Sequence, residues 1–401
     1  MHARPAVVIA TVLIVGAMAA AASAAPVPPR PSGTAPIPYK GMTFTNERYC
    51  PNVTLASAAA NRSLAHLATT GANSVSIVVT QYQSTTTSTD IYPVAAPTPC
   101  TTTPNGWCVT ATDAEVEQSI GAAHALGFKV MLKLQIDLID APGKWRGDIG
   151  VNMTSADWTA WFASYRRAIL RYAAIAERRG VHMLSVSCEL VEASKQEAHW
   201  RRVVAGIRAV YSGVLIDSAN WAAPGGSGEV TDKLWWDAVD VIGVDEYYMA
   251  YFFSHAYANG TFRDEATLLR LWEGIEVQLA ALHAKFNRSI IFSEMGYCSG
   301  DSGRCFRNMP ADEVPSLRTT NASLEAQAVQ YEAALKAFSK HAWWLGVFWW
   351  NWATDPSFGG RGNSCMDPKF KPAEDVLRRW YGATQPQPAM PSEPAQCRCW
   401  L

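Results

Sequence analysis

The feature that most constrains the fold is a series of eight short apolar, β-rich runs separated by segments with helical periodicity. The runs are residues 41–44, 74–79, 129–134, 182–187, 213–216, 239–244, 289–292 and 345–349. Helical patterns are clearest over residues 155–179, 194–211, 264–286 and 323–340, the last with Ser323 as its expected N-cap. Eight strands that alternate with helices predict the α/β class and a single closed (β/α)8 barrel, a TIM barrel.

A doubly wound open sheet is the competing fold for such an alternation. That fold normally has a glycine-rich phosphate-binding turn directly after its first strand. Here the first run is followed by Thr45, Asn46 and Glu47, without any glycine. The closed barrel is therefore the better prediction.

The two ends of the chain differ in composition from the segment between them. Residues 1–24 combine a basic start, an apolar stretch and small residues, which predicts a signal peptide. Residues 25–39 form a Pro-rich lead and residues 384–401 a Pro-rich C-terminal tail, so the catalytic barrel is expected over residues 40–383. We therefore expect a secreted, extracellular protein without a membrane anchor. Six glycosylation sequons agree with this, at Asn52, Asn61, Asn152, Asn259, Asn287 and Asn321.

Charge and cysteine content narrow the choice of partners. The chain has 34 Lys plus Arg against 35 Asp plus Glu, so no basic face is expected for a nucleic acid. Nine Cys in an oxidising compartment favour disulfides, with Cys100–Cys108 and Cys298–Cys305 as short loops and Cys188 as the free thiol. No Cys-x-x-Cys pair or Cys/His cluster is present, so neither a metal nor another cofactor is expected. We expect a monomer.

Carboxylates follow several of the apolar runs, at the end of a barrel strand where active sites lie. Glu189 follows the fourth run, Asp245 and Glu246 follow the sixth, and Glu294 follows the seventh. The fourth and seventh strands face each other across the barrel mouth, so Glu189 and Glu294 are expected to point at one site. Of Asp245 and Glu246, one is expected to face the barrel axis and the other the helix layer.

A pair of carboxyl groups in this arrangement is suited to glycoside hydrolysis, in which one group donates a proton and the other attacks the sugar or activates water. Aromatic residues near the mouth would stack on sugar rings: Trp350 and Trp352 on one face of the eighth strand, and Trp145 in the loop after the third. No Gly-x-Ser-x-Gly, P-loop or His-Glu-x-x-His motif is present. The alternative is structural, namely ion pairs of these glutamates with Lys133, Arg48 or Arg146.

The motifs at successive strand ends resemble glycoside hydrolase family 113, a group of β-mannanases in a clan of retaining (β/α)8-barrel enzymes. The resemblance covers residues from about Lys40 to Tyr381. It is carried by GMTFTN, ANSVSIVVTQYQ, KVMLKLQIDL with KWRGDI, VSCEL, DVIGVDEYY, IIFSEMGY and GVFWWNW, in this order.

The resemblance implies that Glu189 is the acid/base and Glu294 the nucleophile. It also implies that Tyr247 hydrogen-bonds the nucleophile and that Trp350 lies beneath the reactive sugar, with Asn46 a further binding candidate. Cys188 departs from the clan pattern, in which Asn precedes the acid/base and holds the sugar 2-hydroxyl.

We therefore expect a retaining hydrolase of β-mannosidic linkages, with a polysaccharide or oligosaccharide as substrate. A β-glucan or β-galactan hydrolase is one alternative, and a non-catalytic carbohydrate-binding barrel is another. The presence of both Glu189 and Glu294 argues against the last.

Overall fold

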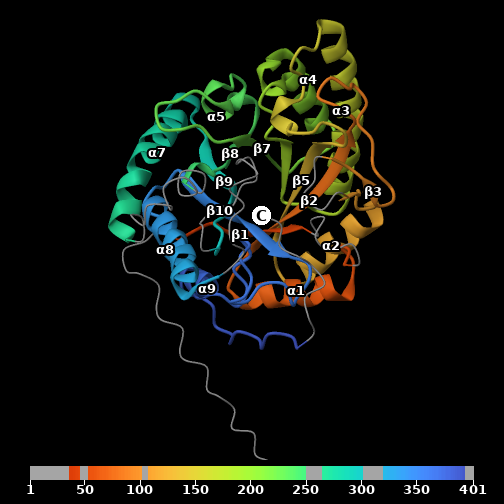
Figure 1. The fold of residues 1–401 in the computed structure, drawn as a ribbon. Helices are drawn as coiled ribbons and strands as arrows, with labels where there is room; N and C mark the ends of the chain where they lie inside the picture. The colour runs from red at the N-terminus through yellow and green to blue at the C-terminus, as the bar shows by residue number, and fades with distance from the viewer. Residues whose placement is uncertain (1–35, 46–52, 102–106, 250–263, 301–318, 393–401) are drawn as a thin grey trace, which may run out of the picture.

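The computed structural model describes residues 36–45, 53–101, 107–249, 264–300 and 319–392. Its centre is a closed barrel of parallel strands in the order β1-β10-β9-β8-β7-β6-β5-β2, which confirms the predicted TIM barrel. The barrel strands are β1 (Tyr39–Thr45), β2 (Ser74–Gln83), β5 (Lys129–Leu138), β6 (Met183–Cys188), β7 (Val214–Asn220), β8 (Val241–Asp245), β9 (Ser289–Met295) and β10 (Trp344–Ala353). Figure 1 shows the helices arranged around them.

The helices of the described residues mostly begin where the sequence periodicity predicts. They are α1 (Ala58–Thr69), α2 (Asp113–Ala125), α3 (Ser155–Arg178), α4 (Glu197–Arg208), α5 (Glu229–Asp232), α7 (Glu265–Phe286), α8 (Asn321–Phe338) and α9 (Pro372–Tyr381). The expected N-cap of α8 is corrected: the cap is Thr320, whose hydroxyl accepts from the Ser323 backbone N–H at 3.1 Å. Ser323 is the third residue of the helix. An N-cap side chain typically accepts from the backbone N–H of that residue, so Ser323 is the capped residue and Thr320 is the cap.

The barrel interior is apolar at the amino ends of the strands and polar at their carboxyl ends. The apolar plug consists of Met131, Met183, Ile216, Val241, Ile291 and Phe348, all buried. Residues of β5 beyond this plug that point the same way are Lys133, Gln135 and Asp137, since side chains alternate along a strand. The plug closes one end of the barrel, so polar chemistry is confined to the other end.

An insertion between β2 and α2, residues 84–112, lies at the carboxyl end of the barrel. It contains the short strands β3 (Thr98–Pro99) and β4 (Trp107–Cys108) and the predicted disulfide Cys100–Cys108, which is confirmed. The insertion is hydrogen-bonded to the loop after β5: the Thr101 N–H donates to the Ile139 carbonyl oxygen and the Gly150 N–H donates to the Thr86 carbonyl oxygen, both at 2.8 Å. It therefore supports the loop after β5.

The other cysteines and the chain ends are only partly described. Cys298 and Cys365 are disulfide-bonded, whereas Cys188 is free and buried, as predicted. Cys305 lies outside the described residues, so its pairing with Cys298 stays a prediction, and residues 1–35 and Asn46 also lie outside them. Within the described ranges, no helix has the length and apolar character to cross a membrane.

Candidate active site

Glu294 lies near the end of β9 and is held by three donors. Lys133 Nζ donates to its Oε1 at 2.6 Å, Gln135 Nε2 donates to the same oxygen at 3.3 Å, and the Tyr247 hydroxyl donates to Oε2 at 3.0 Å. Its exposed fraction is 3%. Hydrogen bonds to both oxygens fix the carboxylate in one orientation. The contact that the family resemblance implies for Tyr247 is thus present.

Glu189 directly follows β6 and has a left-handed backbone conformation, with φ 51°. Its backbone N–H donates to the Ser218 carbonyl oxygen on β7 at 2.8 Å, which fixes the turn at this residue. Its Oε2 accepts from Arg146 Nη1 at 3.0 Å. Arg146 is itself paired with Asp137 at 2.8 Å. Non-Gly residues in this conformation are uncommon and concentrate at functional sites.

The two glutamates have different electrostatic surroundings. Burial raises the pKa of Glu189 to about 8, while the Arg146 guanidinium acts in the opposite direction. Burial and then Asp245 raise the pKa of Glu294, against the Lys133 ammonium. The charge of Glu294 also raises the pKa of Glu189, so the two carboxyl groups interact electrostatically. The largest opposing charge is Arg146 at Glu189 and Lys133 at Glu294.

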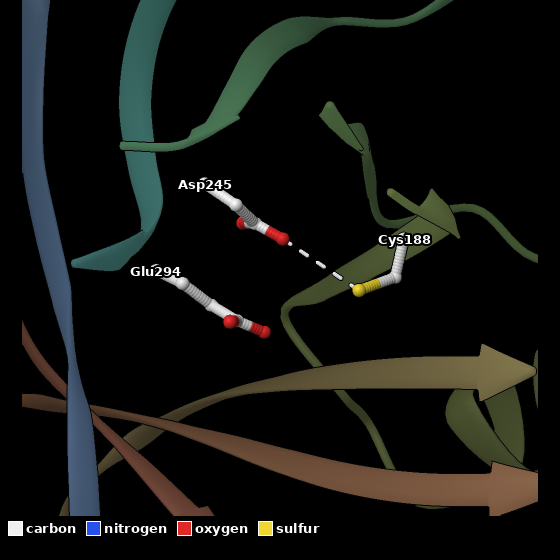
Figure 2. A group of neighbouring side chains, drawn as sticks. All are labelled: Cys188, Asp245 and Glu294. Carbon is white, nitrogen blue, oxygen red and sulfur yellow. Dashed lines mark hydrogen bonds between the residues drawn. The ribbon is translucent and has the colours of Figure 1, made fainter. Parts of the chain in front are cut away.

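Asp245, at the end of β8, lies beside Glu294 and Cys188 (Figure 2). The oxygens of Asp245 and Glu294 and the Cys188 sulfur lie within 4.8 Å of one another, the one cluster of possible metal ligands in the described part of the chain. Lys133 Nζ donates to Asp245 Oδ2 at 2.9 Å and to Glu294 Oε1 at 2.6 Å. A cation of the chain itself thus already offsets part of the negative charge of this cluster.

The residues predicted to bind the sugar differ in how exposed their side chains are. Trp350 is partly buried, with part of its surface free, and Trp145 is 38% exposed beside Arg146. Asn46 lies outside the described residues. Tyr247 is buried against Glu294.

The prediction that Trp352 shares a face with Trp350 at the barrel mouth is wrong. Trp352 is fully buried and its Nε1 donates to the Ser63 carbonyl oxygen of α1 at 3.0 Å. The register explains the error: Met42 pairs with Trp349 and Phe44 with Trp352, so two steps on β1 oppose three on β10. The extra residue restores Trp352 to the outer face that Trp349 occupies. Trp352 is therefore a packing residue.

The ion pairs that the sequence presents as the structural alternative are present at these glutamates. Arg146 pairs with Glu189 and Lys133 with Glu294, while Arg48 lies outside the described residues. One of Asp245 and Glu246 was expected to face the barrel axis, and Asp245 is the one that contacts Lys133 inside the barrel. Glu246 is buried, and its Oε1 accepts from the Tyr248 N–H at 3.1 Å.

Sequence reasoning missed the joint contact of Lys133 with Asp245 and Glu294, and it missed Gln135. A signal for them exists in KVMLKLQIDL, where Lys133, Gln135 and Asp137 recur at every second position of a strand expected to be buried. Polar side chains with this period all face the barrel interior.

A closed (β/α)8 barrel that presents two interacting buried carboxyl groups at the carboxyl ends of its strands has the architecture of a glycoside hydrolase. Comparison with known proteins agrees with this class. The sequence profile described as Glycoside Hydrolase Family 113 matches residues 42–362. The chain therefore belongs to glycoside hydrolase family 113 and is a glycoside hydrolase.

Solved structures of this family resemble the chain over most of its length. A family 113 β-mannanase from Alicyclobacillus acidocaldarius, in complex with ManMIm, is 27% identical with a TM-score of 0.66, covering 86% of this chain and 97% of that one. A second family 113 β-1,4-mannanase is 24% identical with a TM-score of 0.67, covering 86% of this chain and 99% of that one. No curated protein matches the chain.

Proposed function

We propose that this protein is a retaining β-mannanase that cleaves β-mannosidic linkages in mannan-type polysaccharide with Glu189 and Glu294. The observation that carries the proposal is the pair of buried glutamates with different charged neighbours, in a family whose solved members include β-mannanases. Retention needs one carboxyl group that is protonated and one that is ionised. The contact of Glu189 with Arg146 and those of Glu294 with Lys133 and Tyr247 support this assignment of roles.

In the first step of the proposed reaction, a Glu294 oxygen attacks the anomeric carbon and the glycosidic C–O bond breaks. Glu189 gives its proton to the departing oxygen, so a glycosyl ester on Glu294 and an ionised Glu189 result. In the second step Glu189 takes a proton from water, the water oxygen attacks the anomeric carbon and Glu294 is released as a carboxylate. The pKa of Glu189 falls once Glu294 is esterified, because a neighbouring negative charge has disappeared.

Aromatic and polar side chains around the glutamates would hold the sugar. Trp350 offers a partly exposed ring, and Trp145 offers a second ring beside the arginine that contacts Glu189. Tyr247 would lie close to the reacting carbon, since it donates to the Glu294 oxygen Oε2.

The test is release of reducing ends from β-1,4-mannan by the purified protein. Glu294→Ala and Glu189→Gln should each lower kcat by about a thousandfold or more. Glu246→Gln is a matched control, because Glu246 is also a buried glutamate and its side chain accepts from the Tyr248 N–H. Its hydrogen bond to Glu294, at 2.8 Å, joins the Glu246 backbone N–H to the Glu294 carbonyl oxygen, so the substitution keeps it. Retention predicts that the β-anomer appears first when products are followed by NMR. A wild-type protein that equals Glu294→Ala on mannan, glucan and galactan would refute hydrolysis.

The sugar specificity is a separate part of the proposal. Cys188 stands where the clan pattern has the residue for the 2-hydroxyl, and mannose and glucose differ in the configuration of that hydroxyl. Cys188 contacts Gln135 Nε2 at 3.6 Å and Asp245 Oδ2 at 3.6 Å. A β-glucan or β-galactan is therefore the second candidate substrate. Product sizing on purified polysaccharides distinguishes them.

We also propose that the chain is secreted and glycosylated. Residues 1–24 have the composition of a signal peptide, and the Cys100–Cys108 disulfide suits an oxidising compartment. Among the sequon residues, Asn61, Asn152, Asn287 and Asn321 are exposed. Mass spectrometry of the protein from culture medium, before and after deglycosylation, tests both statements.

A further inference from the structure

Lys133 is a fully buried lysine with two carboxylate partners inside the barrel. Its Nζ donates to Asp245 Oδ1 at 3.0 Å, to Asp245 Oδ2 at 2.9 Å and to Glu294 Oε1 at 2.6 Å. Both Lys133 and Asp245 have an exposed fraction of 0%. The three groups lie on β5, β8 and β9, so the contact joins strands far apart in the sequence.

We propose that Lys133 and Asp245 are positioning residues that balance the charge of Glu294 during the reaction, Asp245 retaining the lysine when Glu294 becomes an ester. The inference rests on the proposed function. Asp245 is suited to this role because its carboxylate also accepts hydrogen bonds from groups other than Lys133. Ser293 Oγ donates to Asp245 Oδ1 at 2.7 Å, and Cys188 Sγ donates to Asp245 Oδ2 at 3.6 Å.

Before the reaction, Lys133 stabilises the ionised form of Glu294. Two ionised carboxylates side by side in a buried site repel each other, and one would take up a proton. The Lys133 ammonium between Asp245 and Glu294 offsets that repulsion, so that Glu294 stays ionised and able to attack carbon. Removing one partner of a buried ion pair is far more costly than removing an exposed one.

In the glycosyl ester, Asp245 is the counterion of Lys133. When Glu294 forms a C–O bond to the sugar, its negative charge disappears and its contact with Lys133 weakens. A lysine paired with Glu294 alone would then be a buried cation without a counterion, which would raise the free energy of the ester. Asp245 remains bonded to Lys133 through both of its oxygens. The cluster of Lys133, Asp245 and Glu294 thus passes from a net charge of −1 to zero without an unpaired cation.

Other charged and titratable groups also face Glu294, and the test must separate Lys133 and Asp245 from them. Arg146, from the loop after β5, lowers the pKa of Glu294, and Tyr247 donates to it from beyond β8. Glu189, after β6, responds to the Glu294 charge. Burial keeps the Cys188 thiol neutral by raising its pKa.

The first measurement is the pH dependence of covalent labelling of Glu294 by 2-deoxy-2-fluoromannosyl fluoride, followed by intact-protein mass spectrometry. Labelling requires ionised Glu294, so its rate falls at low pH. Lys133→Met should move this acidic limb up by about 1–3 pH units, because a favourable charge is lost. Asp245→Asn should move it down, because a like charge is lost. The double variant should return towards wild type, since one charge of each sign is removed.

Lys233→Met is a matched control. Lys233 is also fully buried and also paired with two carboxylates, Asp217 and Glu229, but these do not contact Glu294. The control should lower Tm as Lys133→Met does and leave the acidic limb of labelling unchanged. Coincident limbs in wild type and Lys133→Met, or a downward shift for Lys133→Met, would overturn the inference.

The second measurement needs no activity and therefore separates this inference from the proposed function. In Lys133→Met the pKa of folded Glu294 should rise further above its unfolded value, so stability is lost as pH rises. The Tm deficit of Lys133→Met should then be larger at pH 8 than at pH 4.5, and Asp245→Asn in the same chain should reduce that difference. A deficit independent of pH, or one that the second substitution does not reduce, would refute the charge balance even in a protein that labels poorly.

Discussion

Glu189 is the residue whose protonation sets the upper pH limit of the proposed reaction. It is buried at the end of β6 and its pKa is raised to about 8, with Arg146 as the largest opposing charge. Because the general acid works only when protonated, kcat/KM should fall above about pH 8. The alkaline limb of a pH–rate profile on mannan measures this directly.

Arg146 should determine where that alkaline limb lies. The guanidinium favours the ionised form of Glu189, so Arg146→Met should raise the pKa of Glu189 and move the limb to higher pH, with a lower maximal rate because Glu189 is less well oriented. Lys144→Met, in the same loop but paired only with Asp148, is the control and should leave the limb in place. A limb that moves to lower pH in Arg146→Met would contradict this assignment.

Trp350 and Trp352, two of the four tryptophans of β10, differ in exposure. Trp352 is fully buried against α1, so Trp352→Ala should cost about 3–5 kcal/mol of stability. Trp350 retains exposed surface, so Trp350→Ala should lower kcat/KM on mannan by about tenfold with a smaller change in Tm. Thermal melts and kinetics on both variants test the pair. Equal losses of Tm would show that Trp350 is also a packing residue.

The insertion after β2 acts as a support for the loop that carries Trp145 and Arg146. Its disulfide spans a sequence separation of eight residues, for which closing the loop is worth about 2–3 kcal/mol. Replacing both Cys100 and Cys108 by Ser should increase hydrogen exchange over residues 84–112 and 139–150 and raise KM. Exchange in α3 is the internal control and should not change. Unchanged exchange over residues 139–150 would show that the hydrogen bonds alone hold this loop.

The strands could be predicted from sequence because burial on both faces leaves continuous apolar runs, such as 289–292 in β9. The positions of Glu189 and Glu294 followed, since a strand end fixes where the next residue lies. The extra residue between Trp349 and Trp352 was not predictable, because it depends on the pairing of β10 with β1. The Lys133 contacts were missed for a related reason: they join three strands, and only the closed barrel brings these together.

At the scale of the whole molecule, several buried acids make stability depend on pH. Burial raises the pKa of Glu246 to about 8 and that of Glu229 to about 7. An acid whose pKa is higher in the folded state stabilises the fold below its unfolded pKa, and this contribution is lost as pH rises through the folded pKa. Stability should therefore decrease between about pH 4.5 and pH 8, the range between the unfolded and folded values.

Glu246→Gln isolates one part of this effect. Glutamine keeps an oxygen for the Tyr248 N–H but cannot ionise, so the loss of Tm between pH 5 and pH 8 should be smaller than in wild type by about 2 °C or more. Glu325→Gln, at an exposed position of α8, should leave the pH dependence of Tm unchanged. Parallel Tm profiles for wild type and Glu246→Gln would show that Glu246 is ionised at little cost in the native protein.

The ammonium of Lys133 is attached to the backbone of β5 and donates to both Asp245 and Glu294. A dissolved ion in that place would come and go with the composition of the medium, whereas a tethered one has a fixed stoichiometry of one per chain. Dilution, chelators or a change in the ion content of the medium do not remove the Lys133 ammonium. The counterion of Asp245 and Glu294 is therefore part of the polypeptide and does not have to be bound from solution.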